Sequence, residues 1–577
     1  MPGNLNNFPN SSLQGSKTPY VAVLEHWLQI VLVILLTLLM IAVIILAWVP
    51  PVSKDALTHH LAVPKLYLQH GGVYEIPDIV FSYYPMNLDL LYVVPLYFKN
   101  DIIPKYIHFL FALLTAGLIF AYLKKRISTV YGLFGVLLFL SLPIIVKLSI
   151  TVYVDLGLIF FSTAALIVLF KWLAHRFQSK YLLLSAACCG MALGTKYTGL
   201  IVFFLLSLFV PFLYLRSTVK PKNIIEQTKA SGYAILFVSV SLLVFSPWMA
   251  RNYIWTQNPI YPLYDNVFNP RKADSLSISG AVPKDKPERS GGPLNHFSLR
   301  RILYQESGWQ IGLVPVRIFF EGKDGEPQYF DGKLNPLLFF LPFFAFVRLK
   351  KNSESVKLEK KVLLAFSVLV ILVVFFKDIM RIRWIAPAVP PLVMLSAFGL
   401  YELATFVAEH SSTGNRRIWR GALSVVIVLT LSLNAIYIWE QFKTVDPVSY
   451  ISGKVGRDDY IERFRRDYAA MRFANQNLSE DTKILALFLG KRRYYSNRHM
   501  VFDTTMFRHA LHQSKSPEML TLRLNEAGIT HLLVRYDLFA TWVDTNFGER
   551  KKAMLQKFFK EHATLMFSRY MYGLFQV

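Results

Sequence analysis

Residues 27–49, WLQIVLVILLTLLMIAVIILAWV, form an almost wholly apolar run that is followed at once by PPVSKDALTHH, residues 50–60. An apolar run of this length crosses a bilayer as one helix. Pro50 and Pro51 end that helix, because proline cannot donate the backbone hydrogen bond that would continue it. Asp55 is therefore expected just outside the membrane. A carboxylate there would suit a reaction on a lipid-linked substrate, although a solvated loop residue is the plain alternative.

The composition is that of a polytopic α-helical membrane protein. Of the 577 residues, 54% are hydrophobic and 15% are aromatic, and the mean hydropathy is positive. The net charge of +25 could indicate nucleic acid, but the basic residues lie in short clusters between apolar runs, so we expect no nucleic-acid partner. The only cysteines, Cys188 and Cys189, are adjacent in an apolar segment, which predicts no structural disulfide.

Eleven apolar segments are predicted as membrane spans. They are residues 27–49, 104–123, 129–147, 152–172, 181–193, 197–215, 232–250, 336–347, 361–376, 384–405 and 421–440. Segments 181–193 and 336–347 are short for a bilayer. Together the spans predict a transmembrane domain over residues 27–440, preceded by a disordered cytoplasmic segment, residues 1–26.

Basic residues are distributed unequally between the two sides of these spans. If the N-terminus is inside, the inner loops hold nineteen Lys and Arg residues but only four acidic residues. These loops are residues 124–128, 171–180, 216–231, 348–361 and 406–420. Because cytoplasmic loops carry an excess of Lys and Arg, the N-terminus is predicted to be cytoplasmic and the C-terminus extracytoplasmic. The polar regions that then face outward are the loop 49–103, the turn at Asp155, the loop 251–335 and residues 441–577.

Residues 441–577 differ in composition from the spans. Charged stretches with helical periodicity alternate there with short apolar runs. The apolar runs are residues 484–489, 500–502, 531–534 and 571–577. This alternation predicts a small extracytoplasmic α/β domain after the last span.

A second carboxylate, Asp155, lies in the sequence TVYVDLGL near the outer end of the fourth span. An ionisable residue at that depth is costly unless it faces a cavity or a partner, so a structural ion pair is the alternative to a functional role. Asp55 and Asp155 are predicted at the same membrane face. Two carboxylates that converge there could act as a general base and as an anchor for a charge or a metal ion.

The outer loop after Asp55 carries histidines and aromatic residues. His59 and His60 are adjacent and should not face the same way on a helix, so we predict hydrogen bonds to the loop or to a substrate rather than a metal pair. Tyr83 and Tyr84 precede a proline in a stiff aromatic turn. Aromatic faces suit sugars and lipid headgroups, but an interfacial aromatic belt explains them nearly as well.

Four basic residues are predicted at the outer face, where the charge bias disfavours them. Lys196 lies in GTKYTGL, Arg251 in SPWMARNYIWTQNPIYPLY, and Arg381 and Arg383 in DIMRIRWIAPAVP. Together they would form a site for an anionic ligand, because guanidinium groups bind phosphate through two parallel hydrogen bonds. Anchoring to lipid headgroups is the alternative for any one of them.

In these segments the chain resembles the GT-C superfamily of membrane glycosyltransferases. The likeness is to the bacterial branch with aminoarabinose, protein O-mannosyl and galacturonosyl-type transferases. It rests on PPVSKDALTHH, YVDLGL, GTKYTGL, WMARN followed by NPIYP, and RIRWIAPAVP, which occur in the family's order. LFLGKRRYY and GITHLLVRY in the C-terminal region also look like the extracytoplasmic domain of such proteins.

The resemblance implies inverting transfer of a sugar from a polyprenyl-phosphate donor to a lipid, glycan or protein acceptor, at the outer face of the bacterial inner membrane. It implies that Asp55 is the catalytic base and Asp155 the second acidic position. Several relatives carry Glu before the loop proline, where this chain has Tyr84, and Asp89 could substitute. A divalent cation (Mg²⁺, Mn²⁺ or Ca²⁺) would then bind at Asp155 and Asp89.

Two other classes of function stay open from the sequence. Intramembrane Asp and Arg also fit a transporter or flippase for a lipid-linked or anionic solute. A non-catalytic scaffold for envelope assembly is the third possibility. The absence of repeated halves and the gathering of charge at one face favour the enzyme.

Overall fold

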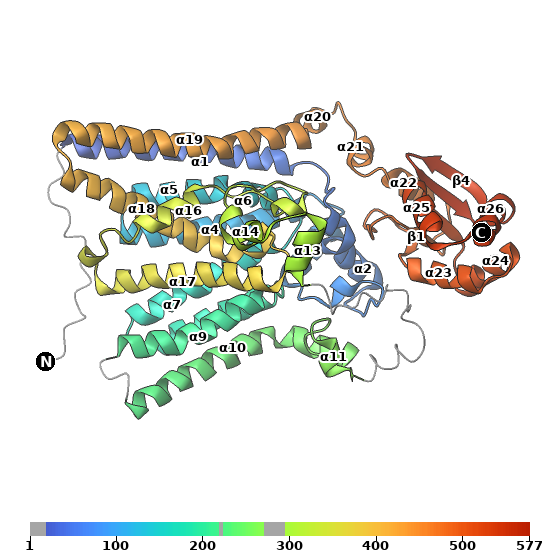
Figure 1. Cartoon of the computed structure of the whole chain (residues 1–577), viewed down its shortest axis with the longest axis horizontal. Helices are drawn as coiled ribbons and strands as arrows, with labels where there is room; N and C mark the ends of the chain where they lie inside the picture. The colour runs from blue at the N-terminus through green and yellow to red at the C-terminus, as the bar shows by residue number, and fades with distance from the viewer. Residues whose placement is uncertain (1–18, 219–222, 271–294) are drawn as a thin grey trace.

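The computed structural model describes residues 19–218, 223–270 and 295–577. A bundle of long helices is joined at one end to a small domain built on a β-sheet (Figure 1). This arrangement confirms the predicted class of fold, a polytopic helical protein with a C-terminal α/β domain.

The bundle contains both long and short helices. Its helices are α1 (Pro19–Ala47), α4 (Ile103–Arg126), α5 (Thr129–Ser141), α6 (Pro143–Ser149), α7 (Asp155–Ala174), α8 (Ser179–Leu193), α9 (Gly199–Ser217), α10 (Ile224–Thr256), α16 (Leu337–Phe344), α17 (Glu354–Lys377), α18 (Val389–His410) and α19 (Thr413–Val445).

Seven helices among the described residues are long and apolar enough to cross a membrane, and they correspond to seven of the eleven predicted spans. The predicted span 129–147 is instead the pair α5 and α6, bent by 66° at Leu142. Pro143 begins the second helix of that pair. The predicted spans 181–193 and 336–347 are helices of 15 and 8 residues, too short to cross a bilayer alone. By length and composition, seven of the eleven predicted spans are thus single helices among the described residues that could cross a membrane, or eight if the bent pair is counted.

The remaining predicted span, 361–376, lies within α17. This helix has 24 residues and runs alongside the long helices in Figure 1, but its first half carries Glu359 and Lys360. Both side chains are buried, and each has an ion-pair or hydrogen-bond partner on a neighbouring helix. The charges that interrupt the apolar run are thus neutralised inside the bundle.

The N-terminal segment predicted to be disordered, residues 1–26, is helical over its last part. Helix α1 begins at Pro19, so residues 19–26 belong to a helix. Residues 1–18 lie outside the described part of the chain. Residues 20–24, YVAVL, are mostly apolar, so the apolar stretch of α1 reaches further back than the predicted span.

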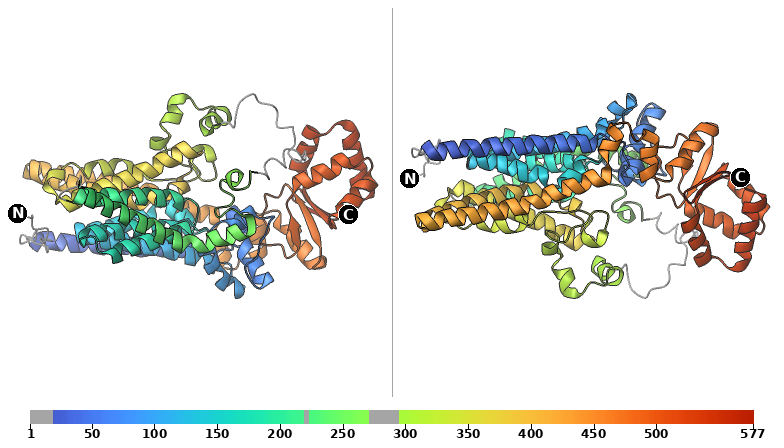
Figure 2. Two further views of the ribbon diagram at one scale, coloured as in Figure 1. Left: turned by 90° about the horizontal axis from the view of Figure 1, so that it is seen from below. Right: turned by 90° about the horizontal axis from the view of Figure 1, so that it is seen from above.

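The long helices differ in how much of their surface the protein covers. The apolar part of α7 is 78% buried, whereas that of α19 is 11% buried. Helices α1 and α19 both lie on the outside of the bundle, and the right view of Figure 2 shows them converging toward the end that carries the sheet domain. Helix α7 is therefore the centre of the bundle, and α19 presents an apolar surface suited to lipid.

Short elements form the two long loops that the sequence predicts to face outward. The first loop holds a π-helical turn (Ala56–His60), α2 (Ala62–His70), a 3₁₀ turn (Val80–Tyr83) and α3 (Asn87–Tyr97). The second holds α11 (Asp265–Phe268), α13 (His296–Leu303), α14 (Gly308–Gly312), α15 (Val314–Arg317) and a 3₁₀ turn (Pro327–Tyr329). Further 3₁₀ turns are Leu349–Lys351, Ile382–Trp384 and Ala386–Ala388.

Beyond α19 the chain forms three helices and then a five-stranded sheet. The elements are α20 (Pro447–Ile451), α21 (Arg457–Phe464), α22 (Tyr468–Asn477), β1 (Lys483–Leu487), β2 (His499–Val501), α23 (Thr504–Gln513), α24 (Pro517–Glu526), β3 (His531–Arg535), α25 (Tyr536–Asn546), α26 (Glu549–Glu561), β4 (Thr564–Arg569) and β5 (Tyr572–Gln576). The strand order is β2-β1-β3-β5-β4, with β1 parallel to β2 and β3, and β5 antiparallel to β3 and β4.

The four apolar runs noted in the sequence supply β1, β2, β3 and β5. Strand β4 has no such run, because it is an edge strand whose six residues are all exposed or only partly buried. The sheet domain lies at the same end of the bundle as α2, while the α18–α19 connection lies at the opposite end (Figure 1). The first outer loop and the C-terminal domain therefore share one end of the molecule.

Candidate active site

A cavity of about 440 Å³ opens at the end of the bundle that carries the first loop. It is lined by residues from the first loop, the α8–α9 connection and the C-terminal end of α17. The polar and charged residues in its wall are Asp55, His59, His60, Asp89, Thr195, Lys196, Thr198, Lys377, Asp378 and Arg383. The cavity thus gathers seven of the residues predicted from the sequence, which are Asp55, His59, His60, Tyr84, Asp89, Lys196 and Arg383.

Asp55 is paired directly with Arg383. Nη1 of Arg383 donates to Oδ2 of Asp55 over 2.6 Å, and both side chains are partly buried. Burial alone would raise the pKa of Asp55, but the charge and hydrogen bond of Arg383 outweigh it and hold that pKa well below its usual value. The charge of Asp155, and then the charge and hydrogen bond of Asp55, raise the pKa of Arg383 against the effect of burial. Both groups are therefore ionised at neutral pH.

Asp155 lies behind the cavity wall. Its side chain is 1% exposed and accepts a hydrogen bond from Nζ of Lys196 over 2.7 Å. Lys196 lines the cavity, whereas Asp155 does not. His108, which sequence reasoning missed, lies fully buried nearby and accepts a hydrogen bond from the backbone N–H of Leu156 at the start of α7. Asp155 is thus placed to hold Lys196 rather than to touch a substrate.

Two glycines explain how the short motifs around these residues pack. A Cβ atom on Gly157 would lie 2.4 Å from Leu88 of α3, and one on Gly194 would lie 2.3 Å from Nδ2 of Asn87. Real Cβ atoms do not approach so closely, so only glycine allows α3 to pack this tightly. The glycines of VDLGL and GTK therefore bring α3, with Asp89, against the cavity.

We expect the Asp155–Lys196 pair to respond unequally to the loss of its two partners. Lys196→Met leaves the buried carboxylate of Asp155 without its partner. Removing one partner of a buried ion pair typically lowers the free energy of unfolding by about 3–5 kcal/mol. Asp155→Asn leaves a lysine that still reaches the cavity, so its thermal midpoint in detergent should fall less. The double variant should recover part of the loss of Lys196→Met. Equal midpoints for both single variants would contradict the assignment of Asp155 as the buried partner.

His59 and His60 both line the cavity, which corrects the prediction that they face different ways. The turn that carries them is π-helical, and their ring centroids are 4.0 Å apart. His60 shares a hydrogen bond of 2.7 Å between its Nδ1 and Oδ1 of Asp89. Nδ1 of His59 has no hydrogen-bond partner in the described part of the chain, and burial lowers the pKa of His59 well below its usual value. His59 is therefore a neutral imidazole at the cavity wall.

Arg251 does not reach the cavity, although it was predicted to bind an anion there. Its guanidinium lies between the rings of Trp248 and Trp255, 4.6 and 4.9 Å from their centroids, and donates to the carbonyl oxygen of Tyr84 over 3.1 Å. Tyr84 lines the cavity, while the hydroxyl of Tyr83 donates to Glu75 over 2.6 Å. Arg251 thus holds the aromatic turn in place from behind, because cation–π stacking fixes its orientation.

Arg381 is also turned away from the cavity. It stacks on Trp384, 5.3 Å from a ring centroid, and lies 3.8 Å from Asp331. Of the four predicted outer cations, only Lys196 and Arg383 line the cavity. Sequence reasoning missed Lys377 and Trp384, which do line it. Lys377 could have been found as a lysine at the outer end of a predicted span, where the charge bias disfavours it.

The residues present do not fit a divalent cation. Such an ion takes several oxygen ligands, and no group of three His, Cys, Asp or Glu side chains within residues 19–218, 223–270 and 295–577 could hold a metal. Asp155 is already neutralised by Lys196, and Asp89 is bound to His60. The prediction that Asp155 and Asp89 bind Mg²⁺, Mn²⁺ or Ca²⁺ therefore finds no support in their surroundings.

The chain is similar to known proteins in one sequence segment and in its whole fold. Residues 102–250 match the dolichyl-phosphate-mannose-protein mannosyltransferase family. No curated protein matches the chain in sequence.

Two solved structures illustrate the likeness of fold. The crystal structure of ArnT from Cupriavidus metallidurans bound to undecaprenyl phosphate matches 94% of this chain and 97% of its own, with a TM-score of 0.54 and 13% identity. The Archaeoglobus fulgidus oligosaccharyltransferase in complex with Zn and sulfate matches 90% of this chain and 70% of its own, with a TM-score of 0.55 and 11% identity.

These similarities define the fold. The chain has the fold of ArnT and of the oligosaccharyltransferase, and its residues 102–250 match one family model, in line with the resemblance seen in the sequence. It is a multi-pass membrane protein with seven long apolar helices among its described residues.

Proposed function

We propose that this protein is an inverting membrane glycosyltransferase that uses a polyprenyl-phosphate sugar as its donor. The acceptor would be a hydroxyl group of a lipid, glycan or protein at the outer face of the bacterial inner membrane. The observation that carries the proposal is the ion pair between Asp55 and Arg383 in the wall of a 440 Å³ cavity, at the end of a membrane helix. A base and a phosphate-binding group side by side are what this transfer requires.

In the first step the donor's phosphate engages Arg383. Nε of Arg383 is buried and has no hydrogen-bond partner among the described residues, so the guanidinium has donors to offer. A phosphate bound to this guanidinium competes with Asp55 for the positive charge of Arg383. Because Arg383 is what lowers the pKa of Asp55, binding of the donor raises that pKa toward its usual value. Asp55 therefore becomes a better base only when the donor is present.

In the second step the acceptor oxygen attacks the anomeric carbon and Asp55 takes the proton of the acceptor hydroxyl. A bond forms between that oxygen and the anomeric carbon, and the bond from the anomeric carbon to the phosphate oxygen breaks. The lipid phosphate leaves with the bonding electrons, and the configuration at the carbon inverts. Arg383 and Lys196 offset the growing negative charge on the phosphate.

The other residues of the cavity would bind and orient the sugar. His59 is neutral, and its Nδ1 has no hydrogen-bond partner in the described part of the chain. Its imidazole can therefore donate a hydrogen bond to a sugar hydroxyl or accept one from it. Tyr84 and Trp384 supply aromatic faces to the wall. Asp155 contributes through Lys196, because it holds the ammonium group at the cavity.

The two rival functions make different demands on the same residues. A transporter needs polar groups along a path through the bundle, whereas the charged residues that line the cavity gather at one end of it. A scaffold has no use for a paired base in a cavity. Among the similar structures, ArnT is bound to undecaprenyl phosphate and the Archaeoglobus fulgidus oligosaccharyltransferase is tethered to an acceptor peptide, which supports a lipid-linked donor and an acceptor outside the membrane.

The direct test is transfer by the purified protein in detergent. A panel of radiolabelled polyprenyl-phosphate sugars is incubated with an envelope extract, and the products are separated by mass. Transfer of one labelled sugar that depends on the protein would support the proposal. Binding of undecaprenyl phosphate without transfer from any donor would favour the transporter, and failure to bind it would favour the scaffold.

The proposed orientation gives a further prediction. We expect residue 577 to lie outside the cytoplasm, because the loops on the other side of the membrane from it carry the excess of Lys and Arg. A reporter that works only outside the cytoplasm should therefore be active when it is fused after residue 577. Alkaline phosphatase and a cytoplasm-dependent fluorescent protein would be compared at that position. As a matched control, the same reporters are placed in the loop 348–361. Fluorescence at residue 577 together with phosphatase activity in that loop would show that the orientation is the opposite of the proposed one.

A further inference from the structure

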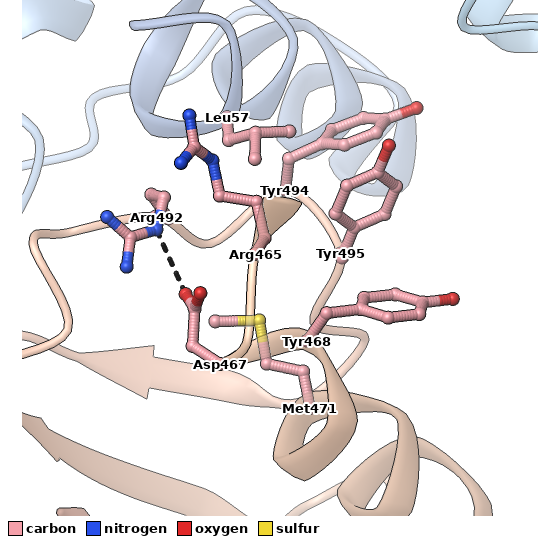
Figure 3. A pocket seen from close by; sticks show the side chains of 8 residues that line it. All are labelled: Leu57, Arg465, Asp467, Tyr468, Met471, Arg492, Tyr494 and Tyr495. Carbon is pink, nitrogen blue, oxygen red and sulfur yellow. Dashed lines mark hydrogen bonds and ion pairs between the residues drawn. The ribbon is translucent and has the colours of Figure 1, made fainter. Parts of the chain in front are cut away.

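The C-terminal domain reaches back to the turn that carries Asp55. Between β1 and β2 its chain leaves the sheet domain, and residues 493–497 contact the first loop through hydrogen bonds. Figure 3 shows Leu57 of that loop beside Tyr494 and Tyr495. The space between the two parts is a cavity of only about 10 Å³, room for no more than one water molecule. The contact is thus closely packed and is not a ligand site.

Backbone and side-chain hydrogen bonds tie the two parts together. The N–H groups of Arg493 and Tyr494 both donate to the carbonyl oxygen of Leu57, over 3.1 Å each. The hydroxyl of Tyr495 donates to the carbonyl oxygen of Pro51 over 2.8 Å, and Arg465 donates to that of Val52. In the sequence, Asp55 lies after two of these acceptors, Pro51 and Val52, and before the third, Leu57. Its backbone is therefore held on both sides by the C-terminal domain.

Lys65 of α2 closes the contact from the other side. Its Nζ donates to the carbonyl oxygens of Tyr494 and Ser496 over 2.8 and 2.9 Å, and to Oδ1 of Asn497 over 2.9 Å. Burial lowers the pKa of Lys65 to about 8, against the charge of Asp101. At neutral pH the ammonium form is still favoured, and only that form has three donors for three acceptors.

The ring of Tyr494 also joins the core beneath the active site. It packs against a buried cluster that contains Ala56, which follows Asp55, and Val154, which precedes Asp155. On its own side, the segment is fixed to the sheet domain. Asn475 donates to the carbonyl oxygen of Tyr495 over 2.8 Å, and Arg498 donates to that of Leu478 over 2.6 Å. The segment therefore connects a rigid domain to the catalytic turn.

We infer that residues 493–497 of the C-terminal domain, together with Lys65, position the π-helical turn that carries Asp55, His59 and His60. None of Lys65, Tyr494 and Tyr495 lines the cavity. They act on catalysis only through the geometry of the turn, so they are positioning residues. A catalytic group displaced by about 1 Å can lose about 10²-fold in rate. The inference rests on the proposed function for its effect on rate, but not for its effect on the turn.

The first test follows the turn itself by hydrogen exchange, measured on the full protein in detergent. Lys65→Met removes the three donors, and Tyr495→Phe removes one hydroxyl with little change of shape. Both should speed amide exchange in the peptide 53–64, where the N–H of Leu61 is bonded to the carbonyl of Ala56. Lys65→Arg, which keeps several donors, should restore part of the protection.

Lys551→Met is the matched control. Lys551 also donates to three carbonyl groups, those of Leu511, His512 and Ser514, but all of them lie within the C-terminal domain. Its loss should leave exchange in the peptide 53–64 unchanged. Equal exchange of that peptide in Lys65→Met, Tyr495→Phe and the unaltered protein would overturn the inference.

The second test separates binding from turnover. In the transfer assay, Lys65→Met and Tyr495→Phe should lower kcat, by up to about 10²-fold for the former, while KM for the lipid-linked donor changes little. Faster exchange with unchanged kcat would show that the contact holds the turn but does not position catalysis, and would overturn the inference. If the unaltered protein transfers nothing, the proposed function fails, and the exchange experiment alone decides whether the turn is held.

Discussion

Replacing Asp55 by Asn is expected to leave a folded, membrane-inserted protein that binds the lipid donor but transfers almost no sugar. A positioned general base contributes about 10²–10⁴-fold to rate, and asparagine cannot take a proton from the acceptor hydroxyl. The side chain keeps its size, so the π-helical turn should persist. Because Asn carries no charge, Arg383 loses its ion-pair partner, and the affinity for undecaprenyl phosphate should stay the same or rise.

Two measurements check this result. Transfer from the radiolabelled donor gives the rate, and equilibrium binding of undecaprenyl phosphate gives the affinity. Asp481→Asn, an exposed carboxylate of the C-terminal domain, is the control for the loss of one negative charge. Turnover by Asp55→Asn within a few-fold of that control would remove Asp55 as the base and favour the transporter or the scaffold.

The position of Asp55 could be predicted from sequence because it depends only on where an apolar run ends. The run ends at Pro50 and Pro51, so the next residues lie just beyond a helix that is long and apolar enough to cross a membrane. The same reasoning placed Asp155 and Lys196 at this face. It could not show that they pair with one another over 2.7 Å, because that depends on how α7 packs against the α8–α9 connection.

The sequence did not indicate which of the predicted basic side chains point into the cavity. Arg251 and Arg383 were predicted at the same face and both were assigned to the anion site, but only Arg383 lines the cavity. Arg251 turns away because Trp248 and Trp255 lie three residues before it and four after it, on the same side of α10. That spacing is visible in the sequence, and it could have indicated a stacked arginine.

The turn at His59 and His60 illustrates a second limit. An α-helix would separate adjacent side chains by about 100°, which led to the prediction that the two rings diverge. The chain instead forms a π-helical turn, in which the N–H of Leu61 bonds to the carbonyl of Ala56. Such turns often mark functional sites, and no local sequence signal distinguishes them from α-helix. The contact with the C-terminal domain, more than 400 residues further along the chain, is equally invisible to local patterns.

Arg383 should give the second large effect. Arg383→Ala removes both the partner of Asp55 and the group proposed to bind the donor phosphate, and loss of one such charge-stabilising donor typically costs about 10²–10³-fold in kcat. Arg383→Lys keeps the charge but replaces a planar fork by a single ammonium group, so its activity should lie between those of Arg383→Ala and the unaltered protein. Both variants should bind undecaprenyl phosphate more weakly, in contrast to Asp55→Asn.

The opposite effects on affinity distinguish a phosphate site from a purely structural ion pair. If Arg383 only held Asp55 in place, loss of either partner would disturb the cavity in the same way, and undecaprenyl phosphate would bind more weakly to both variants. Arg381→Lys is the matched control, since Arg381 is two residues away at the same face but stacks on Trp384 instead of lining the cavity. Its affinity and rate should stay close to those of the unaltered protein. Equal losses for Arg381→Lys and Arg383→Lys would mean that both arginines anchor the protein to headgroups and that the donor's phosphate binds elsewhere.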